Sequence, residues 1–138
     1  MMLNPASSPR HKLNYRILPG KYAICKFAAD AAVPAWSQQS AGLMSITRTA
    51  EELSIVCAEA VIPPEIKAAT GWTCFQLQGP FPFTQTGVLT SFIEPLSSNS
   101  IPIFVVSTFD TDYVLTPEEF SQAAVRLLGE SGHVLLER

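Results

Sequence analysis

Charged residues are scarce in this sequence, and long apolar runs are absent as well. Lys and Arg number 9 among 138 residues, and the net charge is -3. Nucleic-acid binding depends on clustered basic residues, so this balance argues against such a partner. No stretch approaches the ~20 apolar residues that cross a bilayer, and the first eleven residues lack the apolar run of a secretory signal. These absences favour a cytoplasmic protein that does not enter the membrane.

Residues for metal binding and catalysis are also few. The three cysteines, Cys25, Cys57 and Cys74, lie far apart among alternating apolar residues, which predicts buried reduced thiols rather than a disulfide or a metal site. His11 and His133 lie near opposite ends of the chain. The sequence contains no G-x-S-x-G, H-E-x-x-H or lysine-containing phosphate loop. We therefore expect neither an enzyme nor a bound metal or cofactor.

What is abundant is apolar surface, at 47% of residues, enough to form a folded core. Apolar and β-branched patterns bounded by Pro and Gly predict strands over residues 13–18, 22–27, 43–49, 53–59, 73–77, 101–106 and 113–115, with a last edge strand in residues 133–137. Apolar stripes at helical spacing predict helices over residues 86–97 and 116–128, and shorter helical turns over residues 33–39 and 65–69. The pattern indicates an α+β protein.

Proline and glycine refine the expected helix ends. Pro95 cannot donate a backbone hydrogen bond, so we expect the helix over residues 86–97 to bend or end early. The sequence TPEE predicts another helix start, with Thr116 as N-cap, Pro117 in the first position and Glu119 closing the capping box.

The order of these elements repeats. Each half contains strand, helix, strand, strand and a further helix, which predicts a duplicated unit. We divide the chain into an N-terminal arm (1–12), an N-terminal unit (13–70) and a C-terminal unit (71–138). The first helix of the N-terminal unit is about two turns shorter than its counterpart.

The first candidate site is the loop GPFPFTQTGVL, residues 79–89, which connects a strand to a helix. The first turn of a helix presents unpaired N–H groups, and Gly87 lets a ligand approach the main chain. A carboxylate suits this position. The alternative is that Thr84 or Thr86 simply caps the helix.

The second candidate is the turn STFDTD, residues 107–112. Asp110 and Asp112 are suited to bind an ammonium group, next to the hydroxyls of neighbouring Ser and Thr residues. One alternative is a solvated hairpin in which Asp110 forms an Asx-turn. A weaker one is a hydrolase with Asp110 and Asp112 as paired carboxylates.

Three segments resemble a known family: SITRTAEELSIVC (45–57), GPFPFTQTGVLTSFIEPL (79–96) and SIPIFVVSTFDTDYVL (100–115). They are similar to paired ACT-domain proteins, which include CASTOR-type amino-acid sensors and the regulatory modules of aspartate kinases. The resemblance implies two ferredoxin-like βαββαβ units with antiparallel sheets and an amino acid held where two units meet. By this resemblance, the ligand-binding residues are Thr86, Gly87, Val88, Leu89, Thr108, Phe109 and Asp112.

The resemblance implies a regulatory protein that binds a free amino acid and acts through a second copy or a regulated protein partner, and the chemistry of the two candidate loops agrees with such a ligand. The carboxylate of a zwitterionic amino acid suits the loop over residues 79–89, and its ammonium group suits the turn over residues 107–112. The rival interpretation is a structural interaction module without a ligand, whose sheet edges pair with a partner.

Overall fold

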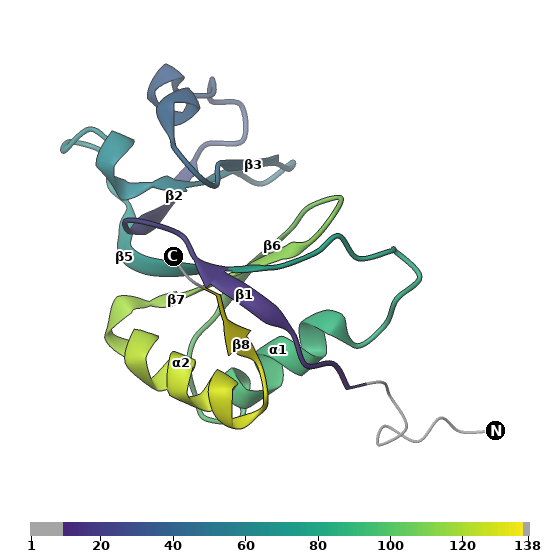
Figure 1. The fold of residues 1–138 in the computed structure, drawn as a ribbon. Coiled ribbons are helices and arrows are strands. Elements are labelled where there is room, and N and C mark those ends of the chain that lie inside the picture. Colours follow the sequence, from purple (N-terminus) through teal and green to yellow (C-terminus); the bar gives the residue numbers. More distant parts are fainter. Residues whose placement is uncertain (1–9, 137–138) are drawn as a thin grey trace.

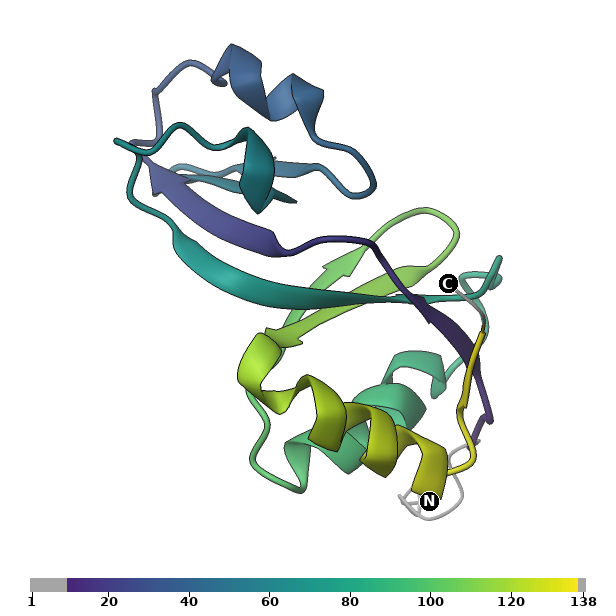
Figure 2. The same cartoon turned by 60° about the vertical axis from the view of Figure 1, so that its left-hand side comes forward.

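The computed structural model describes residues 10–136 and is a mixed α+β structure with one sheet and two α helices (Figures 1 and 2). In chain order its elements are β1 (Asn14–Ile17), β2 (Tyr22–Phe27), η2 (Ala35–Gln39), β3 (Ser45–Arg48), β4 (Leu53–Ala58), η3 (Glu59–Val61), β5 (Ala69–Leu77), α1 (Val88–Ser97), β6 (Phe104–Ser107), β7 (Asp112–Pro117), η4 (Glu118–Phe120), α2 (Ser121–Glu130) and β8 (Val134–Leu135), where η marks short 3-10 helices. Residues 1–9 of the predicted arm lie outside the described residues.

The long strand β5 takes part in the sheet of both halves. Its first residues pair with β2, giving the order β3–β4–β2–β5, and its later residues lie between β7 and β1, giving the order β6–β7–β5–β1. All these pairs are antiparallel, and β8 adds to β1 in parallel. Each group of four strands therefore has a hairpin at one edge and β5 as a member.

A bulge at Gly71 lets β5 continue through a position where the sequence predicted a break. Tyr22 pairs with Trp72 while Ile24 pairs with Ala69, so β5 carries one extra residue between these pairs. Gly71 has φ +78°, a conformation that glycine adopts without steric cost. The strand was expected to begin after this glycine, and that boundary is wrong.

Strand β1 lies beside the C-terminal half of the structure, although the sequence grouped it with residues 13–70. It pairs with the end of β5 and with β8, and Tyr15 packs edge-to-face against Phe75 and Phe92. Figure 2 shows β1 and β8 side by side at the right, next to the end of α2. Since β5 also crosses residues 70 and 71, the division of the chain into two units at that point stays a prediction.

Most predicted strands and the short helix after Pro34 are confirmed, with shifts at their ends. The helical turn expected over residues 65–69 is wrong, since only a single turn closes there, between the Ile66 N–H and the Pro63 carbonyl, and Ala69 already pairs in β5. The predicted N-cap is wrong as well. Thr116 and Pro117 end β7, paired with Thr73 and Trp72, and α2 begins at Ser121 after η4. Strand pairing and full burial of Thr116 outweigh the local capping pattern.

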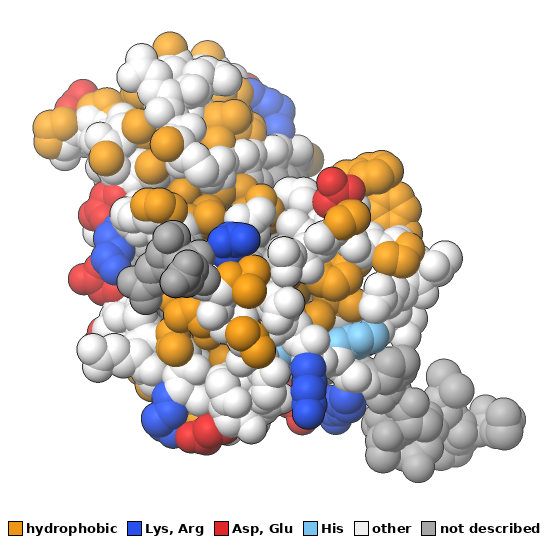
Figure 3. Space-filling model, in the orientation of Figure 1, with side chains coloured by type: hydrophobic (Ala, Val, Ile, Leu, Met, Phe, Trp, Pro, Cys, Tyr) orange, Lys and Arg blue, Asp and Glu red, His pale blue; other side chains and the backbone are white. Residues whose placement is uncertain are grey.

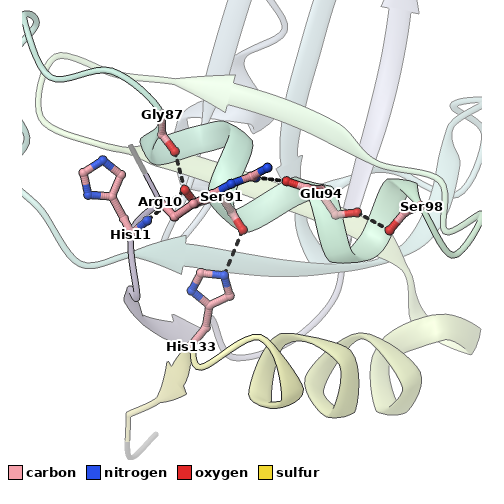
Figure 4. A network of polar contacts seen from close by, with 7 residues as sticks. All are labelled: Arg10, His11, Gly87, Ser91, Glu94, Ser98 and His133. Carbon is pink, nitrogen blue, oxygen red and sulfur yellow. Dashed lines mark hydrogen bonds and ion pairs between the residues drawn. The ribbon is translucent and has the colours of Figure 1, made fainter. Parts of the chain in front are cut away.

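Helix α1 continues to Ser97 despite Pro95, and a histidine explains why (Figure 4). Proline cannot donate to the carbonyl four residues earlier, which is that of Ser91. His133 Nε2 lies 2.9 Å from this oxygen and donates to it, while His133 Nδ1 accepts from the Leu13 N–H at 3.0 Å. The imidazole therefore satisfies the carbonyl that the proline leaves open, and the expected early ending does not occur.

Three groups of buried side chains hold the fold together. Under α1 and α2 lies the largest group, which includes Tyr15, Phe75, Phe92, Leu96 and Leu128. The opposite face of the sheet carries a second group, around Tyr22, Val56, Cys74 and Leu115, and η2 and η3 flank a third around Leu53 and Ile55.

The cysteines are buried free thiols, as predicted. Burial raises the pKa of Cys57 to about 11, with a smaller contribution from neighbouring Cys25, and raises the pKa of Cys74 to about 12. Because a thiolate is the nucleophile and the metal-binding form, such thiols are chemically inert at neutral pH.

Candidate ligand-binding site

The two loops that the sequence singled out lie side by side around one hollow of about 410 Å³. All the predicted site residues except Thr86 line it. The complete lining is Phe81, Pro82, Phe83, Gln85, Gly87, Val88, Leu89, Thr90, Ser107, Thr108, Phe109, Asp110, Thr111 and Asp112. Thr86 instead offers its carbonyl oxygen to the His11 ring, whose Nε2 lies 2.8 Å away. Gly87 and Asp112 therefore share a single cavity.

The start of α1 forms one wall of the hollow. Gly87 is the N-cap residue, with φ 80° and ψ -2°, and no side chain caps the helix. The alternative in which Thr84 or Thr86 caps it is therefore wrong. The Gly87 carbonyl accepts from the Ser91 N–H at 3.0 Å and from the Ser91 hydroxyl at 2.6 Å. The first-turn amides and the positive end of the helix dipole remain directed to this wall.

The turn between β6 and β7 forms the opposite wall. Thr108 organises it: its N–H donates to the Thr111 carbonyl at 2.8 Å, and its hydroxyl lies 3.4 Å from the Thr111 N–H. The Asp112 carboxylate is half-buried and accepts a hydrogen bond from the Ser107 hydroxyl. A hydrolase of this kind requires two carboxylates in one protected site. The turn does not provide this arrangement, because Asp110 is exposed.

A main-chain hydrogen bond ties the two walls together. The Phe81 N–H donates to the Asp110 carbonyl at 2.8 Å. Next to this bond lies Gly79, where an added Cβ would stand 2.7 Å from the Asp110 oxygen and 3.2 Å from the Phe81 nitrogen. Real Cβ atoms do not approach a carbonyl oxygen so closely, so only glycine allows the loop and the turn to meet in this way.

We expect Gly79→Ala to disturb this contact. The methyl group would push the loop from the turn, at a cost of about 1–3 kcal/mol in the free energy of unfolding, as overpacking generally costs. Urea denaturation measures it. The matched control is Gly129→Ala in α2, where an added Cβ meets nothing within 4 Å and should be neutral or slightly stabilising. Equal stability of Gly79→Ala and wild type would show that the walls are not held by this approach.

Sequence reasoning missed the aromatic part of the lining. Phe81 and Phe83 follow Pro80 and Pro82 in a loop, outside every predicted strand and helical stripe, and this position was the available signal. Phe109 was named only through the resemblance to a family.

A second hollow, of about 440 Å³, lies between α1 and α2. Arg10 and Glu94, both of which line it, form an ion pair, and His133 lies at its inner side with both ring nitrogens bonded (Figure 4). Arg10 and His11 of the predicted arm are therefore in contact with α1, since the His11 N–H also donates to the Ser91 hydroxyl oxygen at 3.0 Å. Arg10, Glu94 and His133 are occupied by these contacts, which makes this hollow the weaker candidate.

Neither a membrane helix nor a metal cluster is found in residues 10–136. No helix there is both long and apolar enough to cross a membrane. In the same range, no three His, Cys, Asp or Glu side chains come together in a way that could hold a metal ion.

Comparison with known proteins identifies the kind of domain that carries the site. The ACT domain family matches residues 67–130, which include both walls of the hollow. A second family, described as an N-terminal domain, matches residues 20–65. The ACT domain match therefore covers the C-terminal part of the chain. No match emerges among curated proteins.

Solved structures similar to this chain indicate its family and its fold. It is 46% identical to Atu0741 from Agobacterium tumefaciens, covering 95% of this chain and 96% of that one with a TM-score of 0.85. The chain therefore belongs to the same family as Atu0741. It also has the fold of VC0802 from Vibrio cholerae (16% identity, 88% and 91% covered, TM-score 0.70) and of the aspartate kinase regulatory subunit from Thermus thermophilus (12% identity, 86% and 93% covered, TM-score 0.54).

Proposed function

We propose that this protein is a regulatory sensor that binds a free amino acid in the hollow between the start of α1 and the β6–β7 turn. The observation that carries the proposal is the meeting of Gly87 and Asp112 in one cavity. The ACT domain over residues 67–130 and the fold shared with an aspartate kinase regulatory subunit support a regulatory role over a catalytic one.

The charges of the two walls match the two ends of an amino acid. The uncapped start of α1 stabilises a carboxylate through its free amides and dipole. Asp112, on the other wall, stabilises an ammonium group through a charge-assisted hydrogen bond. Ser107 already donates to one oxygen of this carboxylate, which fixes its orientation.

The proposal includes a second ACT unit that completes the site. The lining comes entirely from residues 81–112, so the N-terminal half leaves the hollow open. A second copy of the chain, associated over this opening, would place the ligand between two units. The matching orders β3–β4–β2–β5 and β6–β7–β5–β1 support the idea that the chain itself is a duplicated ferredoxin-like unit with reduced helices in its first half. We retain a cytoplasmic location in the proposal, because buried reduced thiols suit a reducing compartment.

Thermal unfolding with a panel of amino acids tests the proposal. A ligand at about 100 times its dissociation constant adds roughly 2.7 kcal/mol to the free energy of unfolding, which is a clear shift in melting temperature. Sedimentation with and without that ligand tests the second copy. If no amino acid shifts the transition at millimolar concentration, the proposal fails and the ligand-free interaction module takes its place.

Asp112→Ala should weaken binding without unfolding the protein. Loss of a charge-assisted hydrogen bond of roughly 1.5–3 kcal/mol corresponds to an affinity lower by about 10-fold to 100-fold, measured by calorimetry. Asp30→Ala, which removes an exposed carboxylate in the N-terminal half, is the matched control and should bind as wild type does. Equal affinities of the Asp112 variant and wild type would remove this residue from the site.

A further inference from the structure

Two phenylalanine side chains at the rim of the hollow are exposed yet packed against each other. Phe83 belongs to the loop before α1 and Phe109 to the β6–β7 turn, and their solvent exposures are 76% and 78%. Their ring centroids lie 4.8 Å apart at an interplanar angle of 72°, an edge-to-face pair. Figure 3 shows hydrophobic side chains gathered where this loop and turn meet. Clusters of exposed large apolar side chains are typical of surfaces that bind a ligand or another protein.

The same two rings belong to the lining of the hollow that contains Gly87 and Asp112. Further apolar surface there comes from Phe81, Pro82 and Leu89. The lining contains no Lys, Arg or His, while Asp110 and Asp112 both contribute to it. A ligand side chain in this hollow therefore meets aromatic carbon and negative charge, and no cation.

We propose that the amino acid bound here has a large neutral apolar side chain, aliphatic or aromatic, which packs on Phe83 and Phe109. This inference rests on the function proposed above and specifies its ligand class. The side chain would cover the exposed ring faces, while the carboxylate and ammonium groups reach Gly87 and Asp112.

The charges of the hollow reject the other classes of side chain. An acidic side chain would bring a second carboxylate next to Asp110 and Asp112 with no cation to balance it. A basic side chain has only Asp110 left once Asp112 holds the ammonium group, and ion pairs to an exposed carboxylate contribute little. Apolar contact with the two rings is thus the largest interaction available to the side chain.

Calorimetric titration of the intact chain with leucine, phenylalanine, alanine, aspartate and lysine tests this inference. We expect leucine and phenylalanine to bind about 10-fold more tightly than alanine, because three or more additional carbons are buried to roughly half their area on the open rim. Aspartate and lysine should bind no better than alanine.

The variants Phe109→Ser and Phe83→Ser test whether these two rings cause the preference for large apolar side chains. Each should lower the preference for leucine over alanine from about 10-fold to about threefold, since a single ring supplies about half of the apolar contact. Both positions are exposed, and circular dichroism checks that the variants fold. Val134→Ser is the matched control: it removes another exposed apolar side chain, 53% exposed on β8 and outside the hollow, and should keep the preference.

The outcomes separate this inference from the proposed function. If an amino acid binds but alanine, aspartate or lysine binds as tightly as leucine and phenylalanine, the ligand class is wrong and the sensor function stands. Unchanged leucine affinity in both serine variants likewise overturns the inference, and would leave the pair as a surface for a protein partner. If no amino acid binds wild type, the proposed function itself fails.

Discussion

Phe92→Ala is expected to lower the free energy of unfolding by about 3–5 kcal/mol, the cost of truncating a buried phenylalanine and leaving a cavity. The side chain is fully buried in the middle of α1. Its ring lies 5.2 Å from that of Tyr15 in β1, 6.4 Å from that of Phe75 in β5 and 5.4 Å from that of His133 before β8. One side chain therefore connects the helix to β1, to β5 and to the residue before β8.

Urea denaturation measures this loss, and the same helix supplies the control. Ser97 is exposed at the end of α1, so Ser97→Ala should change stability by less than about 0.5 kcal/mol. A loss below 1 kcal/mol in Phe92→Ala would contradict the proposed central role of this ring.

The second large effect concerns His133, and it depends on pH. This side chain is only 5% exposed, and burial lowers its pKa below the ordinary 6.5, an effect partly offset by the hydrogen bond to the Ser91 carbonyl. Folding thus favours the neutral ring, in which Nδ1 is free to accept from Leu13. The stabilisation is present above pH 6.5 and declines as the pH falls through 6.5 toward the lower folded pKa. We expect wild-type stability to decrease on mild acidification in this window.

His133→Leu should remove this part of the pH dependence and lower stability at pH 7.5 by roughly 2–6 kcal/mol. The leucine leaves the Leu13 N–H and the Ser91 carbonyl without partners, and each buried unsatisfied group costs about 1–3 kcal/mol. His11→Gln, which replaces the other histidine of the chain, keeps His133 and should therefore keep the slope. Urea midpoints from pH 5 to 7.5 measure both; an unchanged slope in His133→Leu would mean that other groups produce it.

Local patterns were sufficient where neighbours along the chain decide the structure. The alternation in YAICKF predicted the strand Tyr22–Phe27 at its observed bounds, and the apolar stripe that follows Gly87 predicted α1. The chemistry of the two loops predicted a shared site, and Gly87 and Asp112 do line one hollow. Amide hydrogens at a helix start and a carboxylate in a turn are local features that a sequence can show, and ligand binding by them stays a prediction.

Local patterns failed where distant partners compete. Thr116 has the sequence signature of a helix cap. In the structure it pairs instead with Thr73 in the sheet, more than forty residues away along the chain. Pro95 should interrupt α1, but His133 supplies the missing donor. Neither partner is visible from a window of neighbouring residues.

The sequence by itself determined the type of most segments, the buried reduced thiols and the two loops whose residues line the hollow. Only the tertiary structure decided that β5 pairs in both halves of the sheet, that β1 joins the C-terminal half of the sheet and that Phe83 packs against Phe109. The physical reason is range: propensity, alternation and capping act over a few residues, whereas strand pairing, burial and ring contacts depend on groups that only folding brings together.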